Sequence, residues 1–361
     1  YYHAEAQKDG KISDYQEAAR WYRKYLAYFP GQADSANTNF LLAEILFESK
    51  SFADATAEYE RTAYDYPVHE KSAEAGYAAI LSYREHEKSL QGAVRDDWHS
   101  QYLDSGLRFA ETYPGHPESG AVLTTVAEDL FAQGQFDLAI TVGQAVVTKQ
   151  PPVKPELART AWTVIAHSNF DLDNYAEAEQ AYYRLRSFTP ADDATANQEI
   201  NDRVASSIYK QGEFAREMGF LEEAVTHFTR LGQVVPDSDI RATAEYDAAA
   251  ALINLQAWDR ASGVLEKFRA DYPDSEFADD VTQKLAVTYL ESGRGVEAAG
   301  EFERIANAEV SSEEVKREAL WKASELYEKS GATSSEQRVL QNIVARYPNP
   351  LAESIEARYR L

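Results

Sequence analysis

The chain contains no cysteine among its 361 residues, so it can form neither a disulfide nor a thiolate metal site. It has no starting methionine and one methionine in all, Met218, and no run of 18 apolar residues that could span a membrane. Basic residues are comparatively few: 36 Lys and Arg stand against 60 Asp and Glu, a net charge of −24. This acidity argues against a nucleic acid partner, because phosphates would be repelled, and it favours neutral or basic partners.

The two ends of the sequence read as helices that are cut. The first residues, YYHAEAQKDG, are typical of the end of a helix, and the last, PLAESIEARYRL, of a helix that is beginning. We therefore expect a segment of a longer protein, so missing targeting signals carry no information. Membrane association through parts beyond this segment stays open. With 44% hydrophobic and 12% aromatic residues, the segment itself can bury a large core.

What the chain does have is a repeat. The phrase FADATAEYERTAYDYP (52–67) returns in related form, and each copy reads as an amphipathic helix that ends at a proline. One residue marks the end of each copy, at spacings between 37 and 47 residues. These markers are Pro30, Pro67, Pro114, Pro151, Pro190, Pro236, Pro273, Val310 and Pro348.

Three further columns of small residues keep a fixed distance from these markers. Twelve residues before the marker stand Ala18, Ala55, Ala139, Ala178, Ala224, Ala261 and Ala298. Twenty-four residues before it stand Ala6, Ala43, Ala127, Ala166, Gly212, Ala249, Ala286 and Ser324. Seventeen residues before it, four repeats have a glycine: Gly134, Gly219, Gly293 and Gly331. The glycines predict a turn that requires positive φ, and the small residues predict two antiparallel helices in close approach.

These columns, with an aromatic residue four positions after the helix alanine and the closing proline, resemble the tetratricopeptide repeat family. The aromatic positions are Tyr22, Tyr59, Tyr182, Phe228 and Phe302. The resemblance covers the whole chain and implies an all-α fold: a right-handed superhelical solenoid of about nine helix–turn–helix repeats, with partial repeats at both ends. Because each helix pair buries its apolar faces only against its neighbours, we expect a single solenoid over residues 1–361.

The repeats depart from the family in length, since most run longer than the family's usual period of about 34 residues. The additions follow the proline, as in YPDSEFADDVTQKLA (272–286). This style of repeat is similar to that of bacterial cell-envelope proteins, among them the lipoprotein of the outer-membrane barrel-assembly machinery and the Tol-associated coordinator of cell-wall synthesis. The similarity implies a location in the periplasm or cell envelope near the outer membrane, with the cytoplasm as the alternative.

Two repeats are longer than the rest. In the third, the excess lies near residues 85–98, between the two helices, and in the sixth it lies in 191–207, where we expect a first helix longer by about two turns. Insertions of this kind often carry function, and a local adjustment of curvature is an equal alternative.

Catalytic and metal-binding patterns were sought without success. No His-Glu-x-x-His pair, nucleophile elbow or phosphate-binding glycine loop occurs, and DLDNYAEA (171–178) lacks the Gly and Glu of a calcium loop. We therefore expect no enzyme, no catalytic residue, no metal and no cofactor.

In the resembled family, the first helix of each repeat lines the concave face that binds a partner. The same positions here form an aromatic and acidic set that suits a peptide or helix. The predicted groove residues are Asn37, Phe40, Glu44, Phe47, Thr124, Glu128, Phe131, Thr163, His167, Phe170, Tyr246, Ile253, Trp321, Glu325 and Glu328. For Phe47, Phe131 and Phe170, packing against the next repeat is an equal alternative. The basic residues with which some family members grip a carboxylate tail are missing from these positions.

Two functions follow from this sequence. The first is a non-enzymatic protein–protein interaction scaffold for assembly of a bacterial cell-envelope complex, binding a helix or peptide in the aromatic-acidic groove. The alternative is a carbohydrate-associated scaffold in polysaccharide or cell-wall assembly or export, supported by 23 Tyr and 5 Trp whose rings can stack on sugars.

Overall fold

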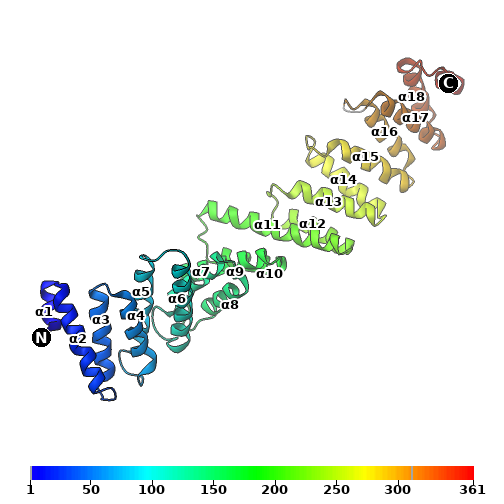
Figure 1. Ribbon diagram of the computed structural model, residues 1–361. Helices are drawn as coiled ribbons and strands as arrows, with labels where there is room; N and C mark the ends of the chain where they lie inside the picture. The colour runs from blue at the N-terminus through cyan, green and yellow to red at the C-terminus, as the bar shows by residue number, and fades with distance from the viewer. Residues whose placement is uncertain (1, 310–311) are drawn as a thin grey trace. The chain divides into compact units, whose positions relative to one another are not determined.

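A computed structural model describes residues 2–309 and 312–361, which form 19 α-helices and one π-helical turn without a β-strand (Figure 1). The predicted all-α repeat fold is confirmed. The chain separates into two compact units, Tyr1–Asp173 and Asn174–Leu361, with the boundary in the turn after α9. The continuity of a single solenoid across that boundary stays a prediction. None of the helices in the described ranges is long and apolar enough to cross a membrane.

The first unit consists of helices in chain order, with successive helices packed side by side (Figure 1). They are α1 (Tyr2–Asp9), α2 (Ile12–Tyr28), α3 (Ser35–Glu48), α4 (Phe52–Glu60) with its π-helical extension η1 (Arg61–Asp65), α5 (Ser72–Glu87), α6 (Gly92–Thr112), α7 (Ser119–Ala132), α8 (Phe136–Val147) and α9 (Pro155–Asp171). Two apolar clusters run through it, one from Ala18 to Ala79 and one from Ile80 to Val164.

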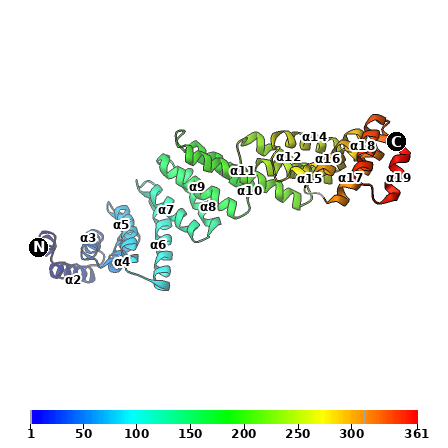
Figure 2. The ribbon, with the colours of Figure 1, turned by 90° about the horizontal axis from the view of Figure 1, so that it is seen from above.

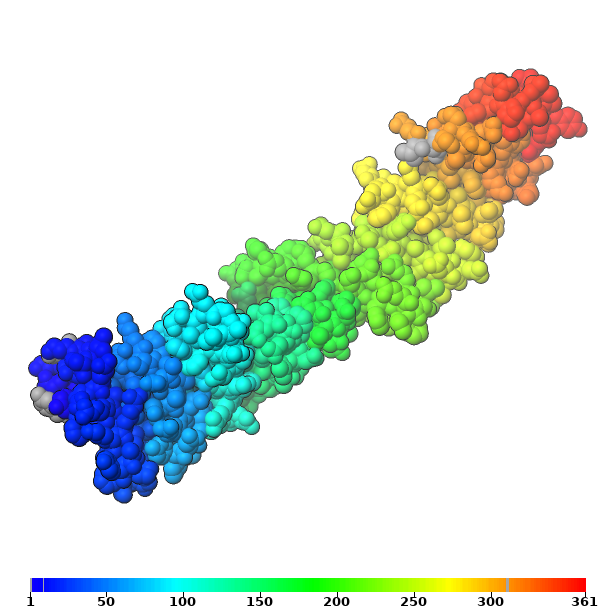
Figure 3. All heavy atoms as spheres, viewed as in Figure 1, coloured from blue at the N-terminus to red at the C-terminus, as the bar shows by residue number. Residues whose placement is uncertain are grey.

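The second unit repeats this arrangement, and Figure 2 shows it from above. Its helices are α10 (Tyr175–Ser187), α11 (Ala194–Glu217), α12 (Leu221–Val234), α13 (Arg241–Asn254), α14 (Trp258–Asp271), α15 (Ala278–Glu291), α16 (Gly295–Asn307), α17 (Glu313–Lys329), α18 (Thr333–Arg346) and α19 (Leu351–Arg360). Its main core lies between α13 and α19. Within each unit the atoms of neighbouring repeats pack directly against one another (Figure 3).

The turn inside each helix pair has the left-handed backbone that the glycine column predicts. Gly134, Gly219, Gly293 and Gly331 have φ between 70° and 81°. The same position in three further repeats is held by residues that carry a side chain: Lys50 (φ 62°), Asp173 (φ 61°) and Gln256 (φ 56°). The turn geometry is therefore shared by seven repeats, although glycine, the residue best suited to it, occurs in four.

The two small-residue columns lie where the helices of a pair meet. All seven alanines of the first column are buried, from Ala18 at 3% exposed to Ala298 at 0%. In the second column, a Cβ added to Gly212 would lie 2.6 Å from the ring of Phe228, which is itself fully buried. A larger side chain at these positions would therefore force the two helices apart.

The prolines end the second helices as expected, because proline lacks the N–H that would continue the helix. Helix α12 ends two residues before Pro236, α14 two before Pro273 and α18 two before Pro348. The marker assigned to Val310 lies outside the described residues.

The two long repeats differ from the others in helix length. Residues 85–98 form the end of α5, a turn at 88–91 and the first two turns of α6, which has 21 residues where α8, the next second helix, has 12. The excess therefore lengthens a second helix, and does not form a separate segment between helices. Residues 191–207 include the first half of α11, a first helix of 24 residues that is capped by the Asp193 carboxylate.

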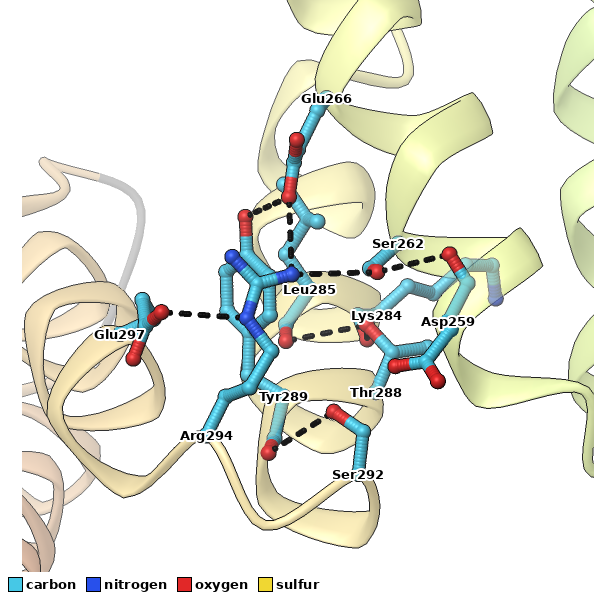
Figure 4. Close-up of polar contacts among 10 residues, drawn as sticks. All are labelled: Asp259, Ser262, Glu266, Lys284, Leu285, Thr288, Tyr289, Ser292, Arg294 and Glu297. Atoms are coloured by element: carbon cyan, nitrogen blue, oxygen red, sulfur yellow. Dashed lines mark hydrogen bonds and ion pairs between the residues drawn. The ribbon is translucent and has the colours of Figure 1, made fainter.

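Ion pairs join successive second helices of the second unit, and we call this set the Arg–Glu ladder. It comprises Glu179–Arg230, Glu222–Arg260, Glu266–Arg294, Glu301–Arg269 and Glu303–Arg338. Figure 4 shows one rung: Arg294, just before α16, donates to Glu266 on α14 and to Glu297 on α16. Each rung bridges two adjacent repeats.

Candidate functional site

The groove positions predicted in the second repeat all lie on α3, and they divide into exposed and buried members. Phe40 is only 4% exposed and packs edge-on against Tyr59, with ring centres 5.8 Å apart. Phe47 is half-buried against Phe52, at 5.2 Å. Phe40 therefore belongs to the core and offers no surface to a partner.

Asn37 and Glu44 are the accessible polar members of this set. Asn37 is exposed, and Glu44 is half-buried. Burial raises the pKa of the Glu44 carboxyl, and the neighbouring carboxylates of Glu48 and Glu74 raise it further, against the opposing effect of Lys71. Three carboxylates, Glu44, Glu48 and Glu74, therefore lie near one another here, with Lys71 beside them.

The fourth and fifth repeats place their predicted residues on α7 and α9. Thr124 is buried and its hydroxyl donates to the Gly120 carbonyl, so it is closed to a partner. The ring centres of Phe131 on α7 and His167 on α9 lie 6.0 Å apart, so this contact joins the first helices of the two repeats. Glu128 is exposed.

Two other predicted positions in these repeats are half-buried. The Thr163 hydroxyl donates to the Arg159 carbonyl one turn earlier, and Phe170 lies near the end of α9. Neither is fully open to solvent.

In the seventh and ninth repeats, the predicted aromatic residues contact the next repeat. Tyr246 stacks on Phe277 with ring centres 4.4 Å apart, and its hydroxyl donates to Asp280. Trp321 donates its indole N–H to Glu353 on α19, at 3.1 Å. These side chains hold neighbouring repeats together.

The remaining members of these two repeats vary in exposure. Ile253 packs against the core, and Glu328 binds Arg360 of α19 at 2.6 Å. Glu325 is exposed and lies 3.7 Å from Lys322. Of the predicted set, the exposed residues Asn37, Glu128, Glu325 and Glu328 can meet a partner directly.

An apolar groove in the second unit was not predicted. It has a volume of about 760 Å³ and lies among α15, α16 and α17; we call it the α15–α17 groove. Val287 and Val315 line it and are 45% and 44% exposed, unusually open for aliphatic side chains. Phe302 and Ile305 add apolar surface from α16, and Lys322 contributes a charge.

A polar cleft of about 650 Å³ lies in the first unit among α5, α6 and α7; we call it the α5–α7 cleft. Glu87 is its central acid: Arg95 Nε donates to Glu87 Oε1 at 3.0 Å, and His99 Nδ1 lies 3.1 Å from the same oxygen. His99 Nε2 lies 4.0 Å from Asp129 on α7. Sequence reasoning had singled out residues 85–98 through their extra length, and these build most of the cleft.

Neither space has the geometry of a metal site. In residues 2–309 and 312–361, no group of three His, Asp or Glu side chains is placed to hold a metal ion.

The family assignment follows from comparison with known repeats. Two models described as tetratricopeptide repeat match the chain, one at residues 3–70 and 126–193, the other at 243–275 and 318–350, which together make up more than half of it. The chain therefore belongs to the tetratricopeptide repeat family. Proteins of this family are generally non-enzymatic scaffolds, and the repeats support a protein–protein interaction scaffold here.

Solved structures are similar only distantly. A structure titled as the functional characterization of Pseudomonas aeruginosa pilF is 14% identical, with a TM-score of 0.28, and the match covers 68% of this chain and 98% of that one. YrrB, titled as a TPR protein with an unusual peptide-binding site, is 13% identical, with a TM-score of 0.29 and coverage of 60% and 91%. Naa15/Naa10 bound to HypK-THB is 14% identical, with a TM-score of 0.40 and coverage of 99% and 62%. No curated protein sequence matches the chain.

Proposed function

We propose that this chain binds an amphipathic helix or peptide of a protein partner in the α15–α17 groove, and that it serves as a scaffold for assembly of a bacterial cell-envelope complex. The observation that carries the binding part is the half-exposed pair Val287 and Val315, which line one apolar groove from two neighbouring first helices. Exposed aliphatic side chains gathered in a concavity are typical of a surface that a partner covers.

The size and walls of the groove fit the apolar face of a short segment. A volume of about 760 Å³ accommodates several side chains, and the Phe302 ring and Ile305 extend the apolar wall below the two valines. Helical partners commonly insert side chains spaced three and four residues apart into such grooves. Gln283, Glu318 and Lys322 can form polar contacts with the backbone or flanking residues of the segment.

Charge favours a neutral or basic partner. The chain carries −24 overall, so a basic segment is attracted over a distance and an acidic one is repelled. The exposed carboxylates of Glu128 and Glu325 add to this effect on their own helices.

The envelope location rests on the sequence alone. The YPDSEFADD phrase at 272–280 resembles the repeats of bacterial envelope proteins, and the lack of cysteine is compatible with an oxidising compartment. Placement in the periplasm, close to the outer membrane, is part of the proposal.

The test compares a blocked groove with a matched surface change. Val287→Glu/Val315→Glu puts two carboxylates into the groove, whereas Val296→Glu alters a valine of equal exposure (46%) on α16 that does not line it. Each chain is used as bait in a bacterial envelope extract, with cross-linking to locate the contact. We expect a partner that cross-links to α15 or α17, and a synthetic peptide of its cross-linked segment that binds the double variant at least about tenfold more weakly than the parent.

Three results would contradict this proposal. They are equal binding of the peptide to the parent and the double variant, cross-links confined to the first unit, and an equal loss of binding in the Val296→Glu control. If no protein is retained and cell-wall glycan fragments change the tryptophan fluorescence, the carbohydrate-associated function replaces it. Half-exposed Trp21 on α2 is the tryptophan most open to such a glycan in the described part of the chain.

A further inference from the structure

The α5–α7 cleft differs in charge from the rest of the molecule. Three cations line it, Arg84, Lys88 and Arg95, against the two carboxylates of Glu87 and Asp129. So many cations in one concavity are unexpected in a chain of net charge −24. Whether they can attract an anion depends on which of them are already paired with a carboxylate.

The charges of the cleft are not equally free. Glu87 is engaged by both Arg95 and His99, and Lys88 is paired with Glu85 at 2.6 Å. Arg84 is different: within the part of the chain that the structure describes, its guanidinium makes no hydrogen bond or ion pair. It is exposed on α5 and lines the cleft. An unpaired guanidinium presents a planar set of donors that matches a carboxylate or phosphate.

The start of α6 supplies a second attraction for an anion. Gln91 is the N-cap of this helix but makes no side-chain capping bond, and both Gln91 and Gly92 line the cleft. The first N–H groups of a helix carry a partial positive charge, and α6 is 21 residues long. This end of α6 and the Arg84 side chain therefore belong to the same cleft.

The cleft exists because the third repeat is longer than its neighbours. Arg95 and His99 lie on the first two turns of α6, which the shorter second helices such as α8 do not have. The extra residues of the third repeat therefore have a structural role: they form one wall of the cleft. Asp129 and Thr125 on α7 form the opposite side.

Asp129 and Tyr102 show that one wall of the cleft is partly shielded from water. Burial raises the pKa of the Asp129 carboxyl, and Glu87 raises it further, while His99 and Arg84 oppose this. Burial raises the pKa of Tyr102 to about 12, with Asp129 adding to the shift and Arg84 opposing it. Arg84 is thus close enough to act electrostatically on both groups.

We propose that the α5–α7 cleft is a binding site for a small anionic ligand with a carboxylate or phosphate group, held by the Arg84 guanidinium and the N-terminus of α6. The site lies in the first unit and does not depend on the groove between α15 and α17. It gives the chain a small-molecule ligand in addition to its protein partner.

Isothermal titration of the full chain with pyrophosphate and with citrate tests the proposal and distinguishes the two anionic groups. We expect binding of one molecule per chain, weakening as NaCl is raised. Arg84→Gln should weaken it about tenfold or more, because hydrogen bonds to charged groups are among the stronger ones. Arg184→Gln, the same change at an exposed arginine of α10 outside the cleft, should leave it within about twofold.

A gain of binding provides the complementary measurement. Asp129→Asn removes a carboxylate from the lining, so it should strengthen anion binding several-fold. Binding of pyrophosphate alone or citrate alone supports the site and identifies the group it takes. No heat with either anion, equal losses in Arg84→Gln and Arg184→Gln, or weaker binding in a folded Asp129→Asn variant overturns the proposal. Unchanged circular dichroism and melting show that each variant is folded.

Discussion

The two units of the chain use their carboxylates in opposite ways. In the first unit, the carboxyls whose pKa is shifted, Glu44, Glu128 and Asp129, all have it raised, chiefly by burial. In the second unit, hydrogen bonds from basic and other donors lower the pKa of Glu222, Glu297, Glu303 and Glu313. The same repeat motif therefore carries carboxylates whose ionised form is unfavourable in the folded state of the first unit. In the second unit it carries carboxylates whose ionised form is favourable.

The two units also differ in what joins successive repeats. The second unit has the Arg–Glu ladder, in which Arg230 binds Glu179 through two hydrogen bonds of 2.9 and 3.0 Å. The first unit relies more on rings, for example Phe131 against His167 with ring centres 6.0 Å apart and Tyr64 stacked on Tyr113 at 6.1 Å. In the first unit, burial outweighs the opposing effect of Lys71 on Glu44 and of His99 and Arg84 on Asp129, so the pKa of both carboxyls stays raised.

The largest effect should come from the cores, where the two units are alike. Phe109 and Phe268 are both fully buried, so Phe109→Ala and Phe268→Ala should each cost about 3–5 kcal/mol of unfolding free energy. Because contacts in a repeat array are made between neighbours, the loss should stay in the unit that carries the change. Hydrogen–deuterium exchange, followed peptide by peptide, would show this as faster exchange in residues 2–173 for one variant and in 174–361 for the other.

These two variants control for each other. If Phe268→Ala accelerated exchange equally in both units, the chain would unfold as one body and the division into two units would have no energetic meaning.

An intermediate effect should come from the ladder. Glu179 has a side chain only 3% exposed and binds both Arg230 and Gln211. Glu179→Gln should cost about 2 kcal/mol, since it leaves a partly buried guanidinium without its counter-ion. Urea denaturation measures the loss.

The matched change in the first unit is Glu17→Gln. Glu17 is one third exposed and pairs with Arg20 across one helical turn at 3.4 Å, so its replacement should cost less than about 0.5 kcal/mol. Equal losses in the two variants would mean that the ladder adds no more than surface pairs do.

The smallest effect should be the change in stability of each unit when the pH is lowered. Glu303 has a pKa below its usual 4.5: burial alone would raise it, but hydrogen bonds from Arg338 and Tyr327 outweigh that. Such a group stabilises the fold above its unfolded pKa, and the contribution is lost as the pH falls through the lower folded value. The half-buried carboxyls of Glu44 and Asp129 behave in the opposite sense, because their pKa is raised and protonation relieves their unfavourable burial.

Acidification from pH 7 to about 4.5 should therefore protect the first unit somewhat, and below pH 4.5 the second unit should lose protection first. Exchange rates, corrected for the intrinsic rate at each pH and compared between units of one chain, measure this directly. A second unit that outlasted the first below pH 4.5 would contradict it, and Glu303→Gln should reduce the difference.

Most of the fold could be predicted because it rests on fixed spacings. The buried alanines, the left-handed glycines and the prolines that end helices all follow from local rules. Lys50, Asp173 and Gln256 adopt the same turn. Aspartate is one of the residue types enriched at positive φ, but no local rule selects Lys50 or Gln256. The spacing predicts an insertion between the two helices of the third repeat, whereas the extra residues lengthen α6, because the sequence does not show which helix takes them up.

The candidate site was less accessible to sequence reasoning. A position on the first helix can face a groove or the next repeat, and only the packing decides between them: Tyr246 meets Phe277, while Glu325 stays exposed. Phe40 is a core residue, so Phe40→Ala would open a cavity and could not test partner binding. The α15–α17 groove and the α5–α7 cleft arise from three helices each, and no single spacing reveals them.

The Arg–Glu ladder also bears on how such an array can grow. Glu222 on α12 binds Arg260 on α14, and Glu266 on α14 binds Arg294 just before α16, so each helix pair carries an acceptor for the next pair and a donor for the previous one. A duplicated copy of residues 241–277 would therefore bring both halves of its own connections with it. A duplication of whole repeats therefore requires no new partner residues, so the number of repeats in this part of the protein can change readily during evolution.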